Sequence, residues 1–323
     1  MKKISVVIPC YNEEANVIPI SEAVIKIFTE QLSRYDYEIL FIDNDSRDRT
    51  RELLRTMCAQ NKKIRAIFNA KNFGQFNSPY YGLLQTTGDA AILMAADFQD
   101  PPEMIVKYVE AWEEGFKIAI GIKTNSMENK FMYWLRCRYY KWIKKLSNVD
   151  QIENFTGFGL YDRDFLKVLR DLDDPTPFLR GIVAELGFRR KEIPYTQPRR
   201  RAGKTSNNFY SLYDAAMLSV TSYTKFGLRI ATFIGAITMV VCLIFAVYYL
   251  VMKLLYWNWF QAGQAPLLIG LLFIGSVIIF FIGMMGEYVL TINQRVMKRP
   301  LVIEEERINF ENTEENSGTE SKS

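Results

Sequence analysis

Two long apolar runs near the carboxyl end constrain the architecture of this chain more than any other feature of its sequence. Residues 230–252 and residues 265–286 contain no charged side chain. A helix needs about 20 apolar residues to cross the hydrocarbon core of a bilayer, and both runs are that long. The sequence therefore predicts two transmembrane helices joined by a short aromatic loop, rather than a further layer of a soluble core.

Positive charges at the ends of these runs predict how the helical hairpin is oriented. Lys225 and Arg229 precede the first run and three cations follow the second between residues 295 and 299, whereas the connecting loop holds only Lys253. Cytoplasmic loops carry the excess of Lys and Arg in membrane proteins. We therefore expect a multi-pass protein of the cell (inner) membrane, with the preceding domain and both termini in the cytoplasm.

The composition excludes several classes of chemistry. The chain has no histidine, so it cannot contain a Ser-His-Asp triad, a Cys-His pair or an HExxH zinc site. Its 4 cysteines form no CxxC pair, which argues against a zinc or disulfide framework. The net charge of +4 is small, so no nucleic-acid partner is expected. Catalysis by this chain must use carboxylates, amides, cations and a bound metal.

Short β-branched runs alternate with helix-length segments in the amino-terminal part of the chain. The expected strands are residues 4–8, 37–42, 64–69, 90–95 and 117–122. The expected helices are residues 14–33, 48–60, 76–87 and 102–115. This alternation is typical of βαβ units and predicts an α/β domain built on a mostly parallel sheet.

The change from charged to apolar sequence predicts four regions. Residues 1–206 form the catalytic domain, residues 207–229 a juxtamembrane amphipathic helix, and residues 230–290 the transmembrane hairpin. Residues 291–323 form a cytosolic tail, which we expect to be partly disordered because it is rich in glutamate. A basic, aromatic segment at residues 129–147 is a further candidate for a helix at the membrane interface, with core packing as the alternative.

Three of the expected strands end in loops rich in carboxylate and amide side chains. These loops are residues 9–14, 43–48 and 96–103. Each loop alone is also what a helix N-cap looks like. Ligands of parallel α/β sheets bind at the carboxyl ends of the strands, where the three loops would meet. Together they predict an oxygen-rich pocket that suits a hard divalent cation bound to a diphosphate.

Six motifs give the chain a resemblance to a known family. The stretches ISVVIPCYNEE, FIDNDSRDRT, KNFGQ, ADFQDPPE, GLYDR and RRRAGKTSNNFY occur in this order and are followed by the two apolar runs. They resemble glycosyltransferase family 2, and within it the bacterial polyprenyl-phosphate glycosyltransferases related to dolichol-phosphate mannose synthase. The similarity covers residues 4–299. It implies a GT-A fold, with a Rossmann-like mostly parallel sheet, and inversion at the anomeric carbon.

The resemblance also implies the substrates. Such an enzyme moves a hexose, here glucose or N-acetylglucosamine, from a nucleotide sugar, expected to be UDP-linked, to undecaprenyl or another polyprenyl phosphate. The product would be a lipid-linked sugar for cell-envelope glycosylation, and the resemblance suggests a homo-oligomer. By matching the family's motifs, the donor site would contain Pro9, Tyr11, Asn12, Glu13, Asp43, Asn44, Asn72, Gly74 and Asp97.

The resemblance predicts a Mg²⁺ or Mn²⁺ site but also shows departures from the family pattern. The metal-binding Asp-x-Asp-x-Gln motif of the family corresponds to Ala95, Asp97 and Gln99, so its first carboxylate is missing. Asp97 and Gln99 would then hold the ion with the diphosphate. Gly157 stands where the family has an aspartate sometimes assigned as the base. A phosphate acceptor tolerates this loss, because its second pKa is about 6 and it is already mostly a dianion at neutral pH.

Basic residues are the expected acceptor site. The residues expected to bind the acceptor phosphate are Lys123, Arg136, Arg199, Arg200, Arg201, Lys204 and Ser206. We expect Asp97, Lys123, Arg200 and Lys204 to be catalytic, because the reaction needs cations that offset charge beside a diphosphate. The alternative for the run at 199–206 is a patch that binds anionic lipid headgroups.

Two other functions are compatible with parts of the sequence. A processive polysaccharide synthase would share the fold, but its Gln-x-x-Arg-Trp acceptor motif is absent from the sequence. A non-catalytic membrane adaptor with a degenerate transferase domain would explain Ala95 and Gly157. Assay of lipid and polymer products distinguishes these alternatives from a lipid-phosphate transferase.

Overall fold

The computed structural model describes residues 1–125, 152–198, 200–201, 264–297 and 299–310, together with single positions between 237 and 256. The chain divides into two compact units. The first comprises Met1–Cys137, Gln151–Ser206 and Lys298–Ser323, and the second comprises Arg138–Asp150 and Asn207–Met297. The first unit therefore includes residues from both sides of the second in the sequence.

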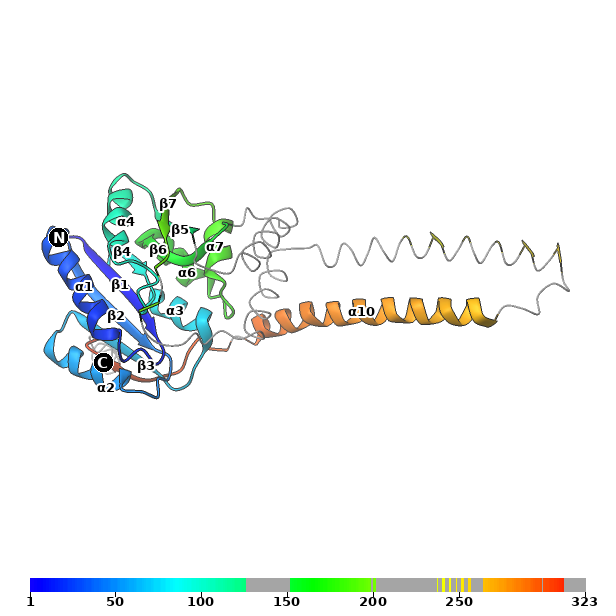
Figure 1. Cartoon of the computed structure of the whole chain (residues 1–323), viewed down its shortest axis with the longest axis horizontal. Coiled ribbons are helices and arrows are strands. Elements are labelled where there is room, and N and C mark those ends of the chain that lie inside the picture. The colour runs from blue at the N-terminus through cyan, green and yellow to red at the C-terminus, as the bar shows by residue number, and fades with distance from the viewer. Residues whose placement is uncertain are drawn as a thin grey trace, which may run out of the picture. The chain divides into compact units, whose positions relative to one another are not determined.

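A single sheet forms the centre of the first unit, with the strand order β7-β5-β6-β4-β1-β2-β3-β8 (Figure 1). Its strands are β1 (Lys3–Cys10), β2 (Asp36–Asp43), β3 (Ile64–Asn69), β4 (Ala90–Leu93), β5 (Ile118–Asn125), β6 (Phe155–Asp162), β7 (Arg190–Thr196) and β8 (Glu304–Ile308). β1 pairs in parallel with both β2 and β4. β2 also pairs in parallel with β3, and β5 pairs in parallel with β7. β6 is antiparallel to β4 and β5, and β8 is antiparallel to β3. The predicted mostly parallel α/β sheet is confirmed.

Helices cover both faces of this sheet. The core on one face joins α1 (Val17–Glu30), α2 (Thr50–Gln60) and α4 (Met104–Glu113) to the strands. The core on the other face joins α3 (Gly74–Leu84), α6 (Arg163–Leu172) and α7 (Leu179–Glu185). Alternate residues of a strand enter opposite cores, as Val6 and Val7 do. Because both faces are buried, β1 is apolar almost throughout and shows no polar alternation.

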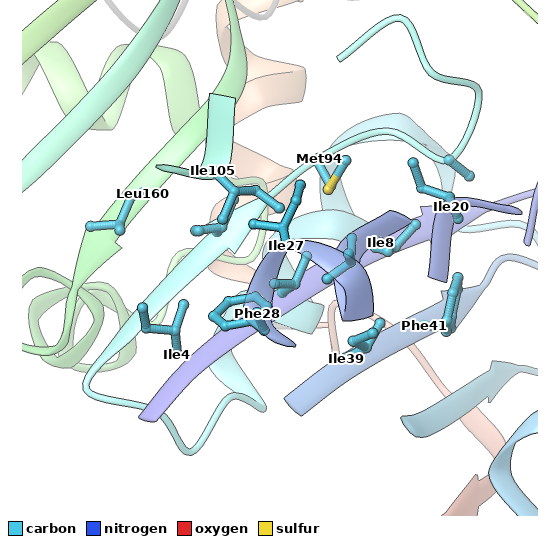
Figure 2. Close-up of a cluster of buried hydrophobic side chains, with 14 of the residues drawn as sticks. Ile4, Ile8, Ile20, Ile27, Phe28, Ile39, Phe41, Met94, Ile105 and Leu160 are labelled. Atoms are coloured by element: carbon cyan, nitrogen blue, oxygen red, sulfur yellow. The ribbon is translucent and has the colours of Figure 1, made fainter. Parts of the chain in front are cut away.

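Helix α1 shows how the sequence directs packing. Its residues Ile20, Val24, Ile27 and Phe28 recur at intervals of three and four, so they share one face of a helix. Figure 2 shows three of them, Ile20, Ile27 and Phe28, beside β1 and β2 side chains in the same cluster. A hydrophobic side chain of this size contributes about 2 kcal/mol when it is fully buried, so this face is sufficient to hold the helix on the sheet.

The expected helices and strands up to residue 125 are all present, with ends that differ by a few residues. The prediction did not include β6, β7, α6 or α7, which follow in the sequence. It also expected partial disorder from residue 291, whereas Glu304–Ile308 forms β8 at the edge of the sheet. The reason is that β8 pairs with β3, and its glutamates meet arginines of α2.

The second unit contains α10 (Gln264–Val296), which includes the second predicted transmembrane run. Large apolar side chains of α10 such as Leu267, Ile279 and Val296 are more than two-thirds exposed. The first predicted run and the predicted interfacial helices lie largely outside the described residues. In the part of the chain that the structure describes, no helix combines the length and the hydropathy expected of a bilayer-spanning segment.

Candidate active site

The polar loops predicted from the sequence meet at one edge of the sheet. Cys10 pairs with Asp43 at the carboxyl ends of β1 and β2, and Val7 pairs with Leu93 at the end of β4. β2 lies on one side of β1 and β4 on the other. The loops after β1, β2 and β4 therefore surround a topological switch point, the position at which open α/β sheets bind their ligands.

The loops after β1 and β2 hold each other through reciprocal hydrogen bonds. The Asn12 amide N–H donates to Ser46 Oγ over 2.8 Å, and Asn12 Oδ1 accepts from the Arg47 amide over 2.8 Å. Asn12 has φ 55 and Asp45 has φ 68, so both are left-handed. Asn and Asp tolerate this conformation better than most residues, so neither position needs a glycine. Pro9, within β1, and Tyr11, which is half-buried, lie beside these loops.

Asp43 is a buried carboxylate with one unused oxygen. Its Oδ2 accepts a hydrogen bond from the Ser46 amide over 3.1 Å and lies 3.1 Å from Arg51 Nε. Its Oδ1 is buried and has no hydrogen-bond partner among the described residues. Burial raises the pKa of Asp43, while the bonds from Ser46 and the charge of Arg51 oppose the increase. A buried acceptor without a partner is costly, so Oδ1 is suited to a donor group of a ligand.

Asn44 organises the neighbouring loop through the hydrogen bonds of its side-chain amide. Its Nδ2 donates to Asn72 Oδ1 over 2.9 Å and to the Gly74 carbonyl over 3.2 Å. Its Oδ1 accepts from Asn69 Nδ2 and from the Phe73 amide. Asn44, Asn72 and Gly74 thus lie together, as expected. The amide of Asn44 is fully engaged with the protein, which favours a role in positioning the loop.

On the other side of the switch point, Asp97 forms an ion pair with Arg200. Asp97 Oδ2 accepts from Arg200 Nε over 2.7 Å, and Oδ1 accepts from the Gln99 amide over 3.1 Å. Arg200 also lies 3.9 Å from Glu13 Oε1. Burial raises the pKa of Glu13, the bond from Asn16 and the charge of Arg200 lower it, and Asp97 raises it further. Three predicted site residues from distant parts of the sequence therefore share one electrostatic cluster.

Next to this cluster lies a second buried acid, Asp100. Its Oδ2 accepts from the Ala95 amide over 3.0 Å, and its Oδ1 accepts from the Tyr195 hydroxyl over 3.2 Å. Burial raises the pKa of Asp100 to about 6, although the Ala95 bond and the charge of Lys123 act in the opposite direction. Lys123 lies on β5 opposite Tyr195 of β7. Lys123 therefore lies close to Asp100 and Tyr195.

Gly157 and Asp162 lie at opposite ends of β6. The antiparallel register pairs Leu93 with Gly159 and Ala90 with Asp162. Gly157 therefore lies toward the edge that carries the site, and Asp162 lies toward the other edge. Asp162 caps α6 and accepts hydrogen bonds from Trp112 Nε1 and Lys117 Nζ. Asp162 consequently cannot replace the aspartate that the family has at position 157.

The donor set for a metal is small. No cluster of three or more Asp, Glu or Cys side chains suited to a metal occurs within the described ranges. Asp97 and Gln99 are neighbours, but one oxygen of Asp97 is already bonded to Arg200. A Mg²⁺ ion bound to a diphosphate needs only one or two protein carboxylates. Asp97 and Gln99 therefore fit an ion that the diphosphate carries, and they do not form a closed metal cage.

Several predicted acceptor residues, namely Arg136, Arg199, Lys204 and Ser206, lie outside the described residues. Arg200 and Arg201 are described, and Arg201 stacks on Phe98 with its guanidinium carbon 5.2 Å from the ring centre. Sequence reasoning did not identify Arg51 or Tyr195 at the site. Neither residue belongs to a motif, and each reaches its carboxylate only through the tertiary fold.

Comparison with known proteins is consistent with this architecture. The prophage bactoprenol glucosyl transferase homolog of Escherichia coli (strain K12) is 30% identical over 306 residues, which are 93% of this chain and 98% of the relative. The bactoprenol glucosyl transferase of Shigella phage SfX is 29% identical over 303 residues, 92% of this chain and 97% of the relative.

Similarity to solved structures is weaker. Glucosyl-3-phosphoglycerate synthase from Mycobacterium tuberculosis, solved with Mn²⁺, UDP and phosphoglyceric acid, is 15% identical, with a TM-score of 0.45. The match covers 68% of this chain and 76% of that chain, and so low a similarity assigns no ligand here. The decisive match is to the family model described as Glycosyl transferase family 2, which covers residues 5–185. The chain therefore belongs to glycosyltransferase family 2.

Proposed function

We propose that the protein is an inverting glucosyltransferase that moves glucose from UDP-glucose to undecaprenyl or another polyprenyl phosphate. The observation that carries this proposal is the cluster of Glu13, Asp97 and Arg200 at the same edge of the sheet as the buried Asp43, one of whose oxygens has no hydrogen-bond partner among the described residues. This arrangement offers a place for a nucleotide on one side of β1 and a charged reaction centre on the other. The names of the relatives that align over more than nine-tenths of the chain support glucose and bactoprenol.

The donor half would bind the nucleoside. Asp43 Oδ1 has no hydrogen-bond partner in the described part of the chain, so it can accept a hydrogen bond from a base N–H or a ribose hydroxyl. Tyr11 lies half-buried directly after β1 and can pack against the base. Asn44, Asn72 and Gly74 would shape the loop beside it through their mutual hydrogen bonds.

The reaction half, made of Glu13, Asp97, Arg200 and Lys123, would position the donor diphosphate and the acceptor phosphate. No general base is needed. An oxygen of the acceptor phosphate attacks the anomeric carbon while the bond from that carbon to the diphosphate breaks. The configuration at the anomeric carbon is inverted, and UDP leaves. The acceptor is mostly a dianion at neutral pH and has no proton to lose before attack. Arg200 and Lys123 would offset the negative charges, with Arg201, Arg199, Lys204, Ser206 and Arg136 as further acceptor ligands in this proposal.

A divalent cation would enter the site bound to the donor diphosphate, rather than bind to the protein before the donor does. Mg²⁺ or Mn²⁺ held by the diphosphate would contact Asp97 and Gln99, and it would supply additional positive charge to the leaving group. For Asp97 to contact the ion, Arg200 would transfer part of its interaction from Asp97 to a substrate phosphate. Arg200 Nε and Asp97 Oδ2 are 2.7 Å apart, so a movement of the two side chains alone would be enough for this exchange.

The acceptor is a lipid, so we propose that the protein is anchored in the cell membrane by its two apolar runs, with its catalytic domain in the cytoplasm. The runs at 230–252 and 265–286 are uncharged, and α10 exposes large apolar side chains along its length. Large exposed apolar surfaces mark sites of membrane or protein association. A homo-oligomer is a further part of the proposal that the same surface could accommodate.

The experiment is a lipid-labelling assay with the purified full-length protein. UDP-[¹⁴C]glucose is incubated with a short polyprenyl phosphate and Mg²⁺ or Mn²⁺, and UDP-N-acetylglucosamine and GDP-mannose serve as alternative donors. A labelled lipid from UDP-glucose is the expected product. Labelled polymer would support a polysaccharide synthase instead, and the absence of turnover with every donor would support the non-catalytic adaptor.

A further inference from the structure

We infer that strand β8 belongs to the donor site, because its Glu305 holds Arg51 in position against Asp43. The inference rests on the proposed function in one respect, namely that Asp43 binds the donor nucleotide. It assigns Glu305 and Arg51 as positioning residues, which act on the ligand through Asp43. Neither residue belongs to a motif that the sequence analysis recognised.

Three contacts form the connection. Arg51 Nε lies 3.1 Å from Asp43 Oδ2, and an amino group of the same guanidinium donates to Glu305 Oε2 over 2.6 Å. The contact between Arg51 Nε and Asp43 is an ion pair, because this nitrogen has no hydrogen-bond partner among the described residues. A second, longer hydrogen bond of 3.4 Å joins the guanidinium to the Asn69 carbonyl. The Arg51 side chain is 19% exposed, and its guanidinium carbon lies 5.2 Å from the centre of the Phe68 ring. Arg51 is thus enclosed between the donor loop, β3 and β8.

The charge of Arg51 matters because Asp43 is fully buried. A buried carboxylate is favourable only when a cation or hydrogen bonds compensate its lost hydration. Among the described residues, Arg51 is the cation in contact with Asp43. The protonated acid would lose one of the acceptor positions that a nucleoside needs, so Arg51 preserves the form of Asp43 that binds.

Glu305 determines where this cation points. Arginine has a long side chain with several rotatable bonds, and fixing it costs conformational entropy. The hydrogen bond to Glu305 is short at 2.6 Å, whereas the hydrogen bond to the Asn69 carbonyl is long at 3.4 Å and therefore weak. We therefore expect the guanidinium to sample orientations away from Asp43 when Glu305 is neutralised.

The connection joins two residues that are far apart in the sequence. Arg51 and Glu305 are separated by 254 positions, and α10 lies between them in the sequence. In Figure 1 the chain after α10 returns in red to the edge of the sheet, where β8 pairs with β3. The donor site thus depends on a segment that the chain supplies after the proposed membrane anchor.

The structure offers a matched control on the same strand. Glu306 accepts hydrogen bonds from Arg55 over 2.6 and 3.0 Å, and Arg55 also stacks on Phe68. Within the described part of the chain, no hydrogen bond or ion pair joins Arg55 to Asp43, and their charges interact only at longer range. Glu305→Gln and Glu306→Gln each remove one carboxylate charge and one arginine pair from β8. They differ in whether that arginine reaches Asp43.

The test compares donor affinity and kinetics of the two full-length variants. Glu305→Gln should raise the Kd for UDP, measured by calorimetry, and the KM for UDP-glucose by about fivefold, as expected for loss of a half-exposed ion pair. kcat at saturating donor should stay within about twofold, because the reaction half is unchanged. Glu306→Gln should leave both constants unchanged, and Glu305→Asp should restore most of the affinity. Melting temperatures control for loss of strand pairing.

A double-mutant cycle tests whether Glu305 acts through Arg51. In an Arg51→Gln background, the Glu305→Gln change should have no further effect on the Kd for UDP. Equal effects of Glu305→Gln and Glu306→Gln, or additive effects of Arg51→Gln and Glu305→Gln, would overturn the inference. A wild-type protein that turns over UDP-glucose but is insensitive to Glu305→Gln would overturn it and leave the proposed function intact. A wild-type protein that binds no nucleotide sugar would overturn both.

Discussion

The two sides of β1 are built in different ways. On the proposed donor side, the loops after β1 and β2 are tied by hydrogen bonds between residues about 35 positions apart, and the side-chain amide of Asn44 has all of its hydrogen bonds within the protein. On the reaction side, Asp97 depends on Arg200, which is 103 positions away and borders residues outside the described ranges. Loops that are tied to each other, and supported through Arg51 by β8, can form before the ligand arrives. A charged pair can exchange its partner when a phosphate enters, and this difference predicts how variants on each side behave.

The largest effect should follow loss of the reaction-side carboxylate. Asp97→Asn should reduce kcat by about 10³-fold, because it removes the remaining carboxylate of the metal motif and the partner of Arg200. The melting temperature should change by only a few degrees, because the asparagine can keep the bond from the Gln99 amide. Retained lipid labelling would show that Asp97 has no role in catalysis and would break the proposed division of the site.

The cation of the same pair should have the next largest effect. Arg200→Ala should lower kcat/KM for the polyprenyl phosphate by about 100-fold, because it removes a charge from the acceptor phosphate and leaves Asp97 unpaired. The Kd for UDP should change much less than the acceptor KM. Arg200→Lys should recover part of the activity, since lysine restores the charge but not the planar guanidinium. Equal losses in UDP binding and acceptor use would argue that Arg200 serves both sides alike.

Asp100, on the reaction side, should make the stability of the protein depend on pH. Its pKa is raised to about 6 in the folded state, so the folded state binds the proton more tightly than the unfolded state does. The stability contributed by the protonated acid is present below about pH 4 and is lost as the pH rises through 6, by at most about 3 kcal/mol. Asp100→Asn should remove this loss. The melting temperature of the variant relative to the wild type should therefore increase between pH 4.5 and pH 7.5, and a constant difference would contradict the assignment.

The smallest effect on activity should come from Asp162, on the far edge of the sheet. Burial opposes ionisation of Asp162, but bonds from Trp112, the Asp164 amide and Lys117 lower its pKa overall. Its stabilisation is thus present at neutral pH and is lost as the pH falls through the folded pKa, opposite in sign to Asp100. Asp162→Ala should cost about 1–2 kcal/mol of stability through the lost helix cap. kcat and both KM values should stay near wild type, and a large kinetic defect would place Asp162 in the site after all.

The meeting of the polar loops at one edge of the sheet could be predicted from the sequence because its signals are local. Asn12 and Glu13 follow β1, and Asp43 and Asn44 lie at the end of β2. Parallel strands bring their carboxyl ends to one edge. The same logic located Asp97 after β4. Asp45, with a φ of 68, is a residue type that tolerates the left-handed conformation better than most.

The sequence by itself determined the alternation of strands and helices, the polar loops at the strand ends, the absence of histidine chemistry and the two uncharged runs. The tertiary structure alone decided that β6 inserts antiparallel between β4 and β5, that Asp162 faces away from the site, and that β8 completes the edge beside β3. It also decided that Arg51 joins Asp43 to Glu305. The physical reason is that strand patterns and turn residues act over a few positions, whereas strand order and ion pairs between distant residues depend on which surfaces the assembled core brings together.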